Sequence, residues 1–222
     1  MTPAELVAEL DREADVALGR LAQRAAAPLP GDTPALSVKE LLVLALKNEL
    51  DATELAAAWL PSTPEIDVKL ALARQAGDEA KHFGLIRRRL DALGVDTRAL
   101  PQLAADKPKS PLQSYLLGLT DTVSRVAAGQ FTREALALVR NRAFIELCEA
   151  AGDTETAALY TDVIQPDEQH HHELGRKLLL QLAVDEDAQA RARAASEKVL
   201  SIAEDLNEIL RIKLGARSAP GC

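Results

Sequence analysis

The sequence predicts an all-α fold, an antiparallel four-helix bundle with one long crossover and extra helices at its N- and C-terminal ends. Three observations lead to this prediction. Of the 222 residues 47% are hydrophobic and only 3% are aromatic, and the excess of alanine and leucine favours helix. Apolar residues recur at helical spacing over long segments. Proline- and glycine-containing breaks separate these segments.

The first helix is predicted at 3–26. Thr2 is a suitable N-cap and Pro3 fits the first helical position, where no backbone N–H is needed. The segment APLPGDTPAL after it contains three prolines and breaks the helix. A second helix is predicted at 37–60, because the sequence SVKE at its start has the pattern of a capping box.

A tight turn, PSTP at 61–64, separates the second helix from the third. The third helix is predicted to continue to Leu93 and to end at Gly94. The residues after it, 94–110, are rich in proline and lack periodicity. They are long for an ordinary connection between helices, which favours a crossover to the far side of a bundle.

Helical periodicity resumes at 112–151, with a candidate break at Gly129. After the turn residues Gly-Asp, another helix is predicted at 154–183. Pro166 lies inside this helix and cannot donate a backbone hydrogen bond. We therefore expect a kink or a distorted hydrogen-bond ladder at that point.

The middle of the chain thus reads as two helical hairpins that form a core bundle at 37–183. The helix predicted at 3–26 and a last helix at 186–213 flank it, and the tail 215–222 is expected to be disordered. The length suits a single domain, 1–222.

Charge and cysteine content exclude several classes of protein. The net charge is −8 and the pI about 5.1, without a basic stripe, so nucleic-acid binding is not expected. The two cysteines, Cys148 and Cys222, do not suggest a disulfide framework, which fits a cytoplasmic protein. The charged N-terminus is unlike a signal peptide. No apolar run approaches the ~20 residues of a membrane span.

A short motif occurs once in each hairpin, as GDEAKHFGLI at 77–86 and PDEQHHHELG at 166–175. The two copies share the pattern Asp-Glu-x-x-His and consist of Asp78, Glu79 and His82, and of Asp167, Glu168 and His171. Residues three apart share a helix face, and each motif lies on a face that is otherwise apolar. A buried carboxylate is costly there unless it is paired or bound to metal.

Two further carboxylates are predicted from hairpin geometry, because antiparallel partners lie at similar distances from the turn. Glu49 lies about as far before the first turn as Glu79 lies after it. Glu134 matches Glu168 in the same way, with Glu146 as the alternative if the helix is interrupted. The predicted metal ligands and catalytic residues are Glu49, Glu79, His82, Glu134, Glu168 and His171. Carboxylates with one imidazole per metal suit iron or manganese.

The residues next to the motifs suggest how the ligands are oriented. A metal-bound histidine usually donates its second N–H to a carboxylate. By the pseudo-symmetry of the hairpins, Asp78 and Asp167 are each predicted to orient the histidine of the opposite motif. His170 and His172 are expected to be solvated neighbours that point away from the site, with His172 as an alternative extra ligand.

These residues resemble the ferritin-like superfamily of di-iron carboxylate proteins over 37–183. The duplicated motif is more similar to the O2-activating members, namely hydroxylase subunits of bacterial multicomponent monooxygenases, the phenylacetyl-CoA oxygenase group and rubrerythrin-type proteins, than to storage ferritins. The chain departs from the pattern at Pro166, at the HHH sequence and in its two extra helices. It contains no Cys-x-x-Cys pair, so a rubredoxin-like domain like that of rubrerythrin is not expected within these residues.

The resemblance implies two iron ions per chain, or a manganese–iron pair, that activate O2 to oxidise a small organic substrate. It also implies an electron-donor protein and a homodimer, for which the apolar stripe of 186–213 is a candidate interface, although this stripe could instead cover the bundle. Two alternatives remain. One is a ferroxidase, an iron or manganese handler or a peroxide-protection protein without an organic substrate. The other is a structural bundle without stoichiometric metal.

Overall fold

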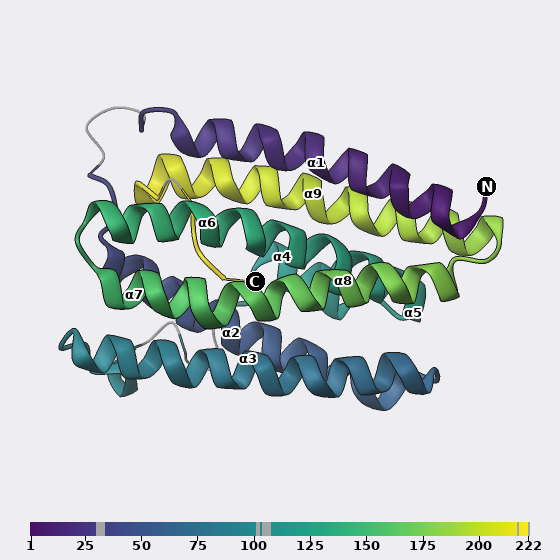
Figure 1. The fold of residues 1–222 in the computed structure, drawn as a ribbon, viewed down its shortest axis with the longest axis horizontal. Coiled ribbons are helices and arrows are strands. Elements are labelled where there is room, and N and C mark those ends of the chain that lie inside the picture. Colours follow the sequence, from purple (N-terminus) through teal and green to yellow (C-terminus); the bar gives the residue numbers. More distant parts are fainter. Residues whose placement is uncertain (30–33, 101–102, 104–107, 217, 222) are drawn as a thin grey trace.

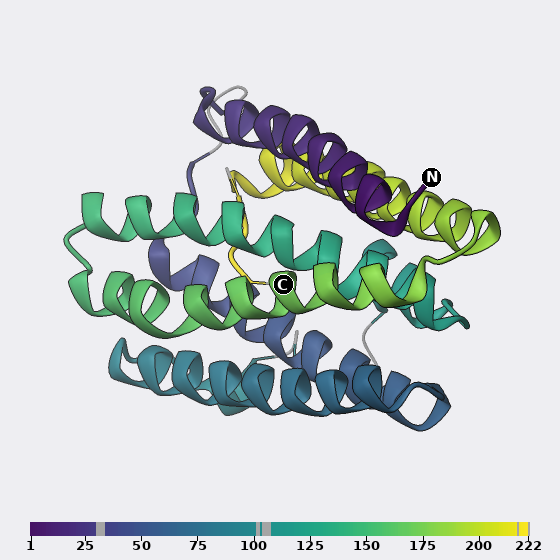
Figure 2. The same cartoon turned by 45° about the vertical axis from the view of Figure 1, so that its right-hand side comes forward.

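The computed structural model describes residues 1–29, 34–100, 103, 108–216 and 218–221. This part of the chain is helical and contains no strand, which confirms the all-α prediction for the described residues. Figures 1 and 2 show long helices stacked in layers that run along a common direction. Among the described helices, none is long and apolar enough to cross a membrane.

The first hairpin agrees closely with the prediction. Helix α2 (Val38–Trp59) begins at the expected capping box, in which the backbone N–H of Glu40 donates to Oγ of Ser37 at 3.3 Å. A short 3₁₀ turn, η1 (Leu60–Ser62), comes directly after α2. Helix α3 (Ile66–Ala92) then returns along α2, and the two helices pack against each other over most of their length.

The crossover after α3 begins as predicted, with Gly94 in a positive-φ conformation (φ 80°). A short 3₁₀ turn, η2 (Thr97–Ala99), lies within the connection. The remainder of the predicted 94–110 segment includes 101–102 and 104–107, which lie outside the described residues.

The helical segment predicted at 112–151 is divided, but the break lies at 118–121 rather than at the candidate position, Gly129. A short helix, α4 (Pro111–Leu117), ends at Gly118, and α5 (Thr122–Val126) begins after Asp121. The Asp121 carboxylate accepts a hydrogen bond from a backbone N–H in the first turn of α5. This N-cap satisfies a donor that a continuous helix would have paired internally, so the chain can break at this point.

The interruption expected at Gly129 takes a different form. From α5 the chain passes without a break through a π-helical turn, η4 (Ala127–Arg133), into α6 (Glu134–Ala150). Gly129 lies within η4, where a Cβ atom would be 2.8 Å from the Trp59 ring. The glycine therefore permits close packing of η4 on α2 rather than ending a helix.

The helix predicted at 154–183 is continuous, but its hydrogen-bond pattern changes as expected near Pro166. Helix α7 (Thr154–Leu159) leads into a second π-helical turn, η5 (Tyr160–Ile164), and then into α8 (Gln165–Leu182). A proline cannot make the normal bond to the carbonyl four residues earlier. A wider turn just before Pro166 accommodates this missing bond.

The extra helices, α1 (Pro3–Ala26) and α9 (Glu186–Leu214), pack against each other and cover the second hairpin (Figures 1 and 2). The apolar stripe of α9 faces inward at Val199 and Ile202, which are 0% and 8% exposed. At these two positions the stripe therefore covers the bundle, which was one of the two roles predicted for it; the other was a dimer interface.

The C-terminal tail was predicted to be disordered over 215–222, of which 217 and 222 lie outside the described residues. Gly215 ends α9 in the left-handed conformation (φ 64°), which suits a glycine at a helix C-terminus. The described residues beyond it turn into the protein, and Ala216 and Ala219 are only 1% and 9% exposed. Figure 1 shows this tail in yellow, crossing α6 toward the body of the helices.

The apolar core of the described residues falls into two main clusters along the helices. One cluster contains Leu46 of α2 and Ile86 of α3. The other contains Leu55 of α2 and Leu72 of α3. On each helix the predicted motif positions lie between these two residues in the sequence. The fold therefore surrounds the candidate site with apolar side chains at both ends.

Helix α8 approaches the backbone of η4 closely at Gly175. A Cβ atom there would lie 2.6 Å from the backbone carbon of Gln130 and 2.7 Å from the nitrogen of Phe131. We expect Gly175→Ala to destabilise the fold by about 1–3 kcal/mol and to lower the Tm by on the order of 5 °C, measured by thermal unfolding. Gly19→Ala is the control, because its Cβ would meet nothing within 4 Å. Equal Tm values for the two variants would contradict this packing.

Candidate metal centre

Each helix of the two hairpins contributes acidic or imidazole side chains to one buried cluster. Helices α2 and α6 supply one glutamate each, whereas α3 and α8 supply a glutamate and a histidine each. The members are Glu49, Glu79, His82, Glu134, Glu168 and His171, all at most 1% exposed. These are the six residues that the sequence singled out, and the structure brings all of them together.

Local backbone structure places the ligands of the second hairpin. The turn η4 ends immediately before Glu134, and η5 ends four residues before Glu168. A π-helical turn adds a residue to the helix and so rotates the next helical segment about the helix axis. In both helices the residues after the turn face the first hairpin, where regular helix geometry on α3 places Glu79 and His82 on one face.

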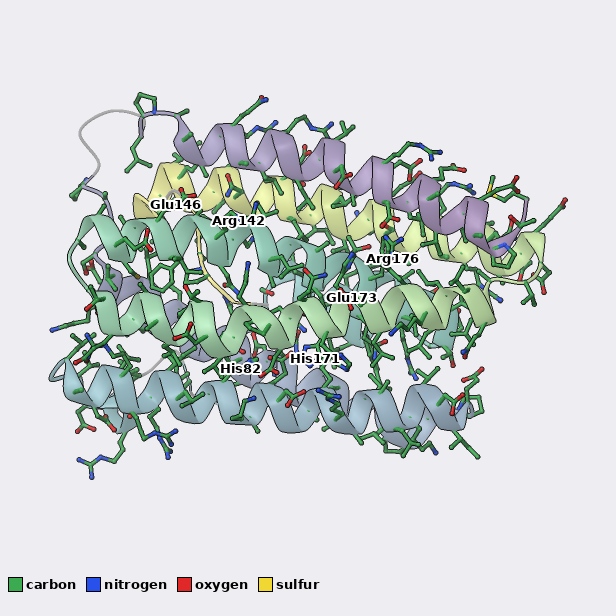
Figure 3. All side chains as sticks on the ribbon, in the orientation of Figure 1. His82, Arg142, Glu146, His171, Glu173 and Arg176 are labelled. Carbon is green, nitrogen blue, oxygen red and sulfur yellow. The ribbon has the colours of Figure 1, made fainter. Side chains whose placement is uncertain are left out.

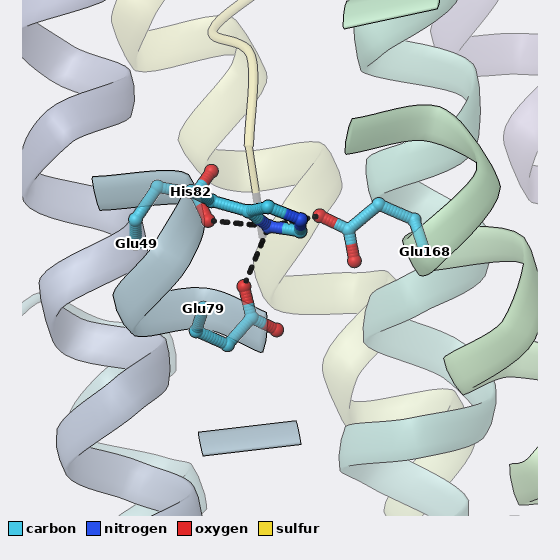
Figure 4. Close-up of side chains that lie close together, drawn as sticks. All are labelled: Glu49, Glu79, His82 and Glu168. Carbon is cyan, nitrogen blue, oxygen red and sulfur yellow. Dashed lines mark ion pairs between the residues drawn. The ribbon is translucent and has the colours of Figure 1, made fainter. Parts of the chain in front are cut away.

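Two groups of ligand atoms can be distinguished, and within each the atoms lie within 4.8 Å of one another. In the first, Nδ1 of His82 lies 3.4 Å from Oε2 of Glu49, 3.4 Å from Oε2 of Glu79 and 3.9 Å from Oε1 of Glu168. Figure 4 shows the imidazole between carboxylates that come from three different helices.

The second group mirrors the first. Nδ1 of His171 lies 3.6 Å from Oε1 of Glu79 and 3.4 Å from Oε2 of Glu168, and Glu134 completes the group. Glu79 and Glu168 belong to both groups. Each presents one oxygen to each histidine, so these two carboxylates lie between the two halves of the cluster.

The outer nitrogens of both histidines contact aspartates across the hairpins. Nε2 of His82 lies 3.0 Å from Oδ2 of Asp167, and Nε2 of His171 lies 3.2 Å from Oδ2 of Asp78. The crossed contacts predicted from pseudo-symmetry are therefore present. An aspartate at Nε2 accepts a hydrogen bond from the ring N–H, so that in the neutral ring Nδ1 is the nitrogen whose lone pair is directed at the cluster, as metal ligation requires.

Removing one of these aspartates tests that role. We expect Asp167→Asn to weaken metal binding by about 10–100-fold, because the amide no longer fixes the His82 tautomer as a carboxylate does. The measurement is a competition titration of the variant against a chelator of known affinity. The matched control is Asp162→Asn, since Asp162 is exposed on η5. Equal affinities for the two variants would refute the orienting role.

An additional polar side chain touches the cluster without having been predicted. Gln75, which is 6% exposed, donates from Nε2 to Oε1 of Glu134 at 2.5 Å, and Nε2 also lies 3.5 Å from Oε1 of Glu79. It lies one helical turn before Glu79, on the same face of α3. In the sequence, only this position on an otherwise apolar helix face could have indicated that Gln75 contacts the cluster.

Burial makes the carboxylates of the cluster difficult to ionise. It raises the pKa of Glu49 to about 8 and that of Glu168 to about 8. It also raises the pKa of Glu134 well above its usual range, and the charge of Glu168 adds to this effect. Without a cation, the cluster therefore retains protons that ordinary surface carboxyl groups lose.

The first histidine and its own motif glutamate form an ion pair. Burial opposes charge on both, but for Glu79 the close contact with His82 and the charge of His171 outweigh it and lower the pKa to about 2. Burial likewise lowers the pKa of His82, but the carboxylates of Glu49 and Glu79, each 3.4 Å from its Nδ1, prevail and raise that pKa to about 12. In the absence of metal, the His82 imidazolium thus supplies the positive charge that a metal ion would supply among these carboxylates.

The bonding of Glu49 shows whether the cluster suits a metal ion. Both of its oxygens are buried, and among the described residues neither has a hydrogen-bond partner, although Oε2 lies close to His82. A buried carboxylate without donors is costly, and coordination to a cation removes that cost. These buried glutamate and histidine groups can hold a metal ion.

The remaining sequence candidates lie outside the ligand groups. Glu146 is exposed on α6, and Figure 3 shows it apart from His82 and His171, so of the two alternatives Glu134 is the one in the cluster. His172 differs from the expectation of a solvated residue. It is half-buried, and its Nδ1 donates to the carbonyl oxygen of Phe131 at 2.7 Å. His170 is also half-buried.

No family model matches the chain, and comparisons with curated proteins and with solved structures found no match either. Fold and site alone therefore define the class to which the protein can be assigned. It is a helical protein with a buried carboxylate–histidine cluster that is able to hold metal.

Proposed function

We propose that the protein is a di-iron carboxylate oxidoreductase that activates O2 to oxidise a small organic substrate. The observation that carries this proposal is the pair of overlapping ligand groups, which share Glu79 and Glu168 and each add one glutamate and one histidine. This donor set is that of the dimetal carboxylate proteins, with Glu-x-x-His on two helices and a single Glu on each of two others.

The fold is consistent with the ferritin-like architecture to which the motif points. We propose that α2, α3, α6 and α8 form the antiparallel four-helix bundle, with the long crossover between α3 and α4, and that α1 and α9 are additions to it. This rests on the packing of α2 on α3, of α6 on α8, and of the two pairs on each other.

Charge supports two ions rather than one. The four glutamates carry four negative charges when ionised, which two divalent cations would neutralise. Oxygen-rich sites with few imidazoles favour iron and manganese, so Fe/Fe and Mn/Fe both fit the donor set. When bound, ferrous ions would supply the electrons for reduction of O2.

The protein residues would perform three tasks at this centre. Glu49 and Glu134 each serve one half-site, and Glu79 and Glu168 keep the two half-sites at a fixed separation. Asp78 and Asp167 fix the tautomers of the ligand histidines, as their contacts with Nε2 require. The apolar clusters at both ends of the site exclude water from it. A cytoplasmic homodimer that receives electrons from a donor protein completes the proposal.

Anaerobic loading with Fe(II) followed by exposure to O2 tests the function. We expect about two iron ions per chain, a transient absorption and O2 uptake that exceeds buffer alone. Elemental analysis with anomalous scattering from crystals would place the ions between Glu79 and Glu168. O2 uptake that yields only ferric iron, or a cage by light scattering, would favour iron handling. Less than one metal per chain would contradict the proposal.

A further inference from the structure

The C-terminal tail is anchored beside the metal centre through a single peptide group. Nδ2 of Asn48, on α2, donates to the carbonyl oxygen of Pro220 at 3.0 Å. The N–H of Gly221 donates to Oδ1 of Asn141, on α6, at 2.8 Å. Because both bonds engage the peptide unit that joins Pro220 to Gly221, the two asparagines together fix its plane and its direction.

The anchored peptide group lies against a metal-site carboxylate. A Cβ atom on Gly221 would be 2.8 Å from Oε1 of Glu49 and 3.3 Å from Cβ of Asn48. Gly221 also has a φ of 89°, a conformation that residues with a side chain rarely adopt. Glycine is therefore required here for both space and backbone, and the tail touches the carboxylate whose oxygens have no hydrogen-bond donor among the described residues.

The tail lies on the α2–α6 side of the cluster, between Asn48 and Asn141. On the α3–α8 side, each histidine is covered by an aspartate, and Lys81 adds an ion pair with Asp167. Helices α2 and α6 make few direct contacts with each other, as do α3 and α8, and the tail runs along the seam between α2 and α6, where it is bonded to both helices. Figure 4 shows it descending between the ribbons toward the side chains of the cluster.

We propose that the seam between α2 and α6 is the reactant-binding groove of the metal centre, that it accepts an extended secondary amide, and that residues 218–221 occupy it as a removable internal plug. This inference rests on the proposed function, since the groove serves the same centre. Asn48 and Asn141 would hold the amide of an incoming ligand as they hold the peptide group of the tail.

The interactions that hold residues 218–221 in the groove are weak enough for the segment to leave it. Its described residues have small side chains, and two neutral hydrogen bonds hold its peptide group. Residues 218–221 belong to no helix, and such irregular segments open at lower free energy than the helices around them. Nδ2 of Asn141 is buried without a partner among the described residues, which leaves a donor for a ligand that the tail does not use.

Full-length variants separate the plugged from the open state. Gly221→Ala should expel the tail through its contact with Glu49, and Asn48→Ala should loosen it by removing one bond. Gly19→Ala on α1 is the matched control, because its Cβ meets nothing within 4 Å. Hydrogen–deuterium exchange of the peptides that contain 218–221 reports whether the tail is seated, with or without metal.

Access to the centre is then measured as the rate at which a chromogenic chelator removes Fe(II) from the anaerobically loaded protein. We expect removal from Gly221→Ala to be at least about 10-fold faster than from the native protein, equivalent to about 1.4 kcal/mol of protection. Asn48→Ala should be intermediate, and Gly19→Ala should match the native protein. Two results would contradict the proposal that the tail is a plug. One is a tail that stays protected from hydrogen exchange in Gly221→Ala, and the other is a released tail with an unchanged rate of iron removal.

A peptide in trans tests the chemistry of the groove. Acetyl-Ser-Ala-Pro-Gly-methylamide, added to Gly221→Ala, should slow iron removal in a saturable manner, and the same peptide ending in alanine should not. No difference between the peptides would overturn the proposed fit of the Pro-Gly peptide group against Asn48, Asn141 and Glu49. If iron binds and its removal is gated but no variant reacts with O2, the proposed function alone fails. If O2 reacts at equal rates in all variants, the plug alone fails. If no iron binds, both fail.

Discussion

Glu168→Gln is expected to stabilise the metal-free protein at pH 8.5 and to abolish the stabilisation that Fe(II) gives the native protein. Glu168 is fully buried, and burial raises its pKa to about 8. Above that pH the native carboxylate is ionised in an apolar interior near Glu79, whereas glutamine is neutral and of similar shape. The variant removes the cost of that charge, so its Tm without metal should be higher.

The effect of metal should have the opposite sign. Oxygens of Glu168 belong to both ligand groups, so one substitution damages both half-sites. Ligands bound at 100 times their Kd stabilise by about 2.7 kcal/mol per site, and two sites should raise the native Tm by on the order of 10 °C. In Glu168→Gln we expect less than one ion per chain and no rise in Tm, measured by elemental analysis and thermal unfolding.

The control for this experiment is Glu146→Gln, which changes an exposed carboxylate on α6. It should retain two ions and the native response to metal. If Glu168→Gln were less stable than the native protein without metal, the carboxylate would be part of the packing rather than a charge held for a cation. Retention of two ions by Glu168→Gln would refute its place between the half-sites.

The ligand cluster could be predicted because it depends on two regular geometries. Helical spacing places Glu79 and His82 on one face, and equal distances from a turn bring Glu49 to their level. The crossed Asp–His contacts could be predicted from the similarity of the two hairpins. Each of these predictions needs only the spacing of residues along the helices, which can be counted in the sequence.

Features that depend on distant partners could not be predicted in this way. The tail has the small and polar composition of a disordered segment, yet Asn48 and Asn141 hold its peptide group in place. Gln75 was missed because an amide that supports a carboxylate has no spacing pattern of its own. The helix break before α5 depends on the cap at Asp121, and many aspartates in helices have no such role.

The metal-free protein is expected to lose stability as the pH rises from 5 to 8. The pKa of Glu49 and that of Glu168 are about 8 in the folded protein, against 4.5 for an ordinary glutamate. Between these values the folded state binds more protons than the unfolded state, so the free energy of unfolding falls with pH. The slope is about 1.4 kcal/mol per pH unit for each group, or at least about 3 °C in Tm per unit.

The motif residues of the first hairpin do not reverse this sign. The raised pKa of His82, about 12 against 6.5, gives stability that is lost as the pH rises above 6.5. The lowered pKa of Glu79 affects stability only below pH 4.5. Glu49→Gln should remove the contribution of one group to the slope of the free energy of unfolding against pH. Bound metal should reverse it, because metal binding displaces the protons and tightens as the pH rises. A Tm without metal that is constant from pH 5 to 8 would mean that these carboxylates are already compensated within the protein, and the physical argument for a cation at this site would be lost.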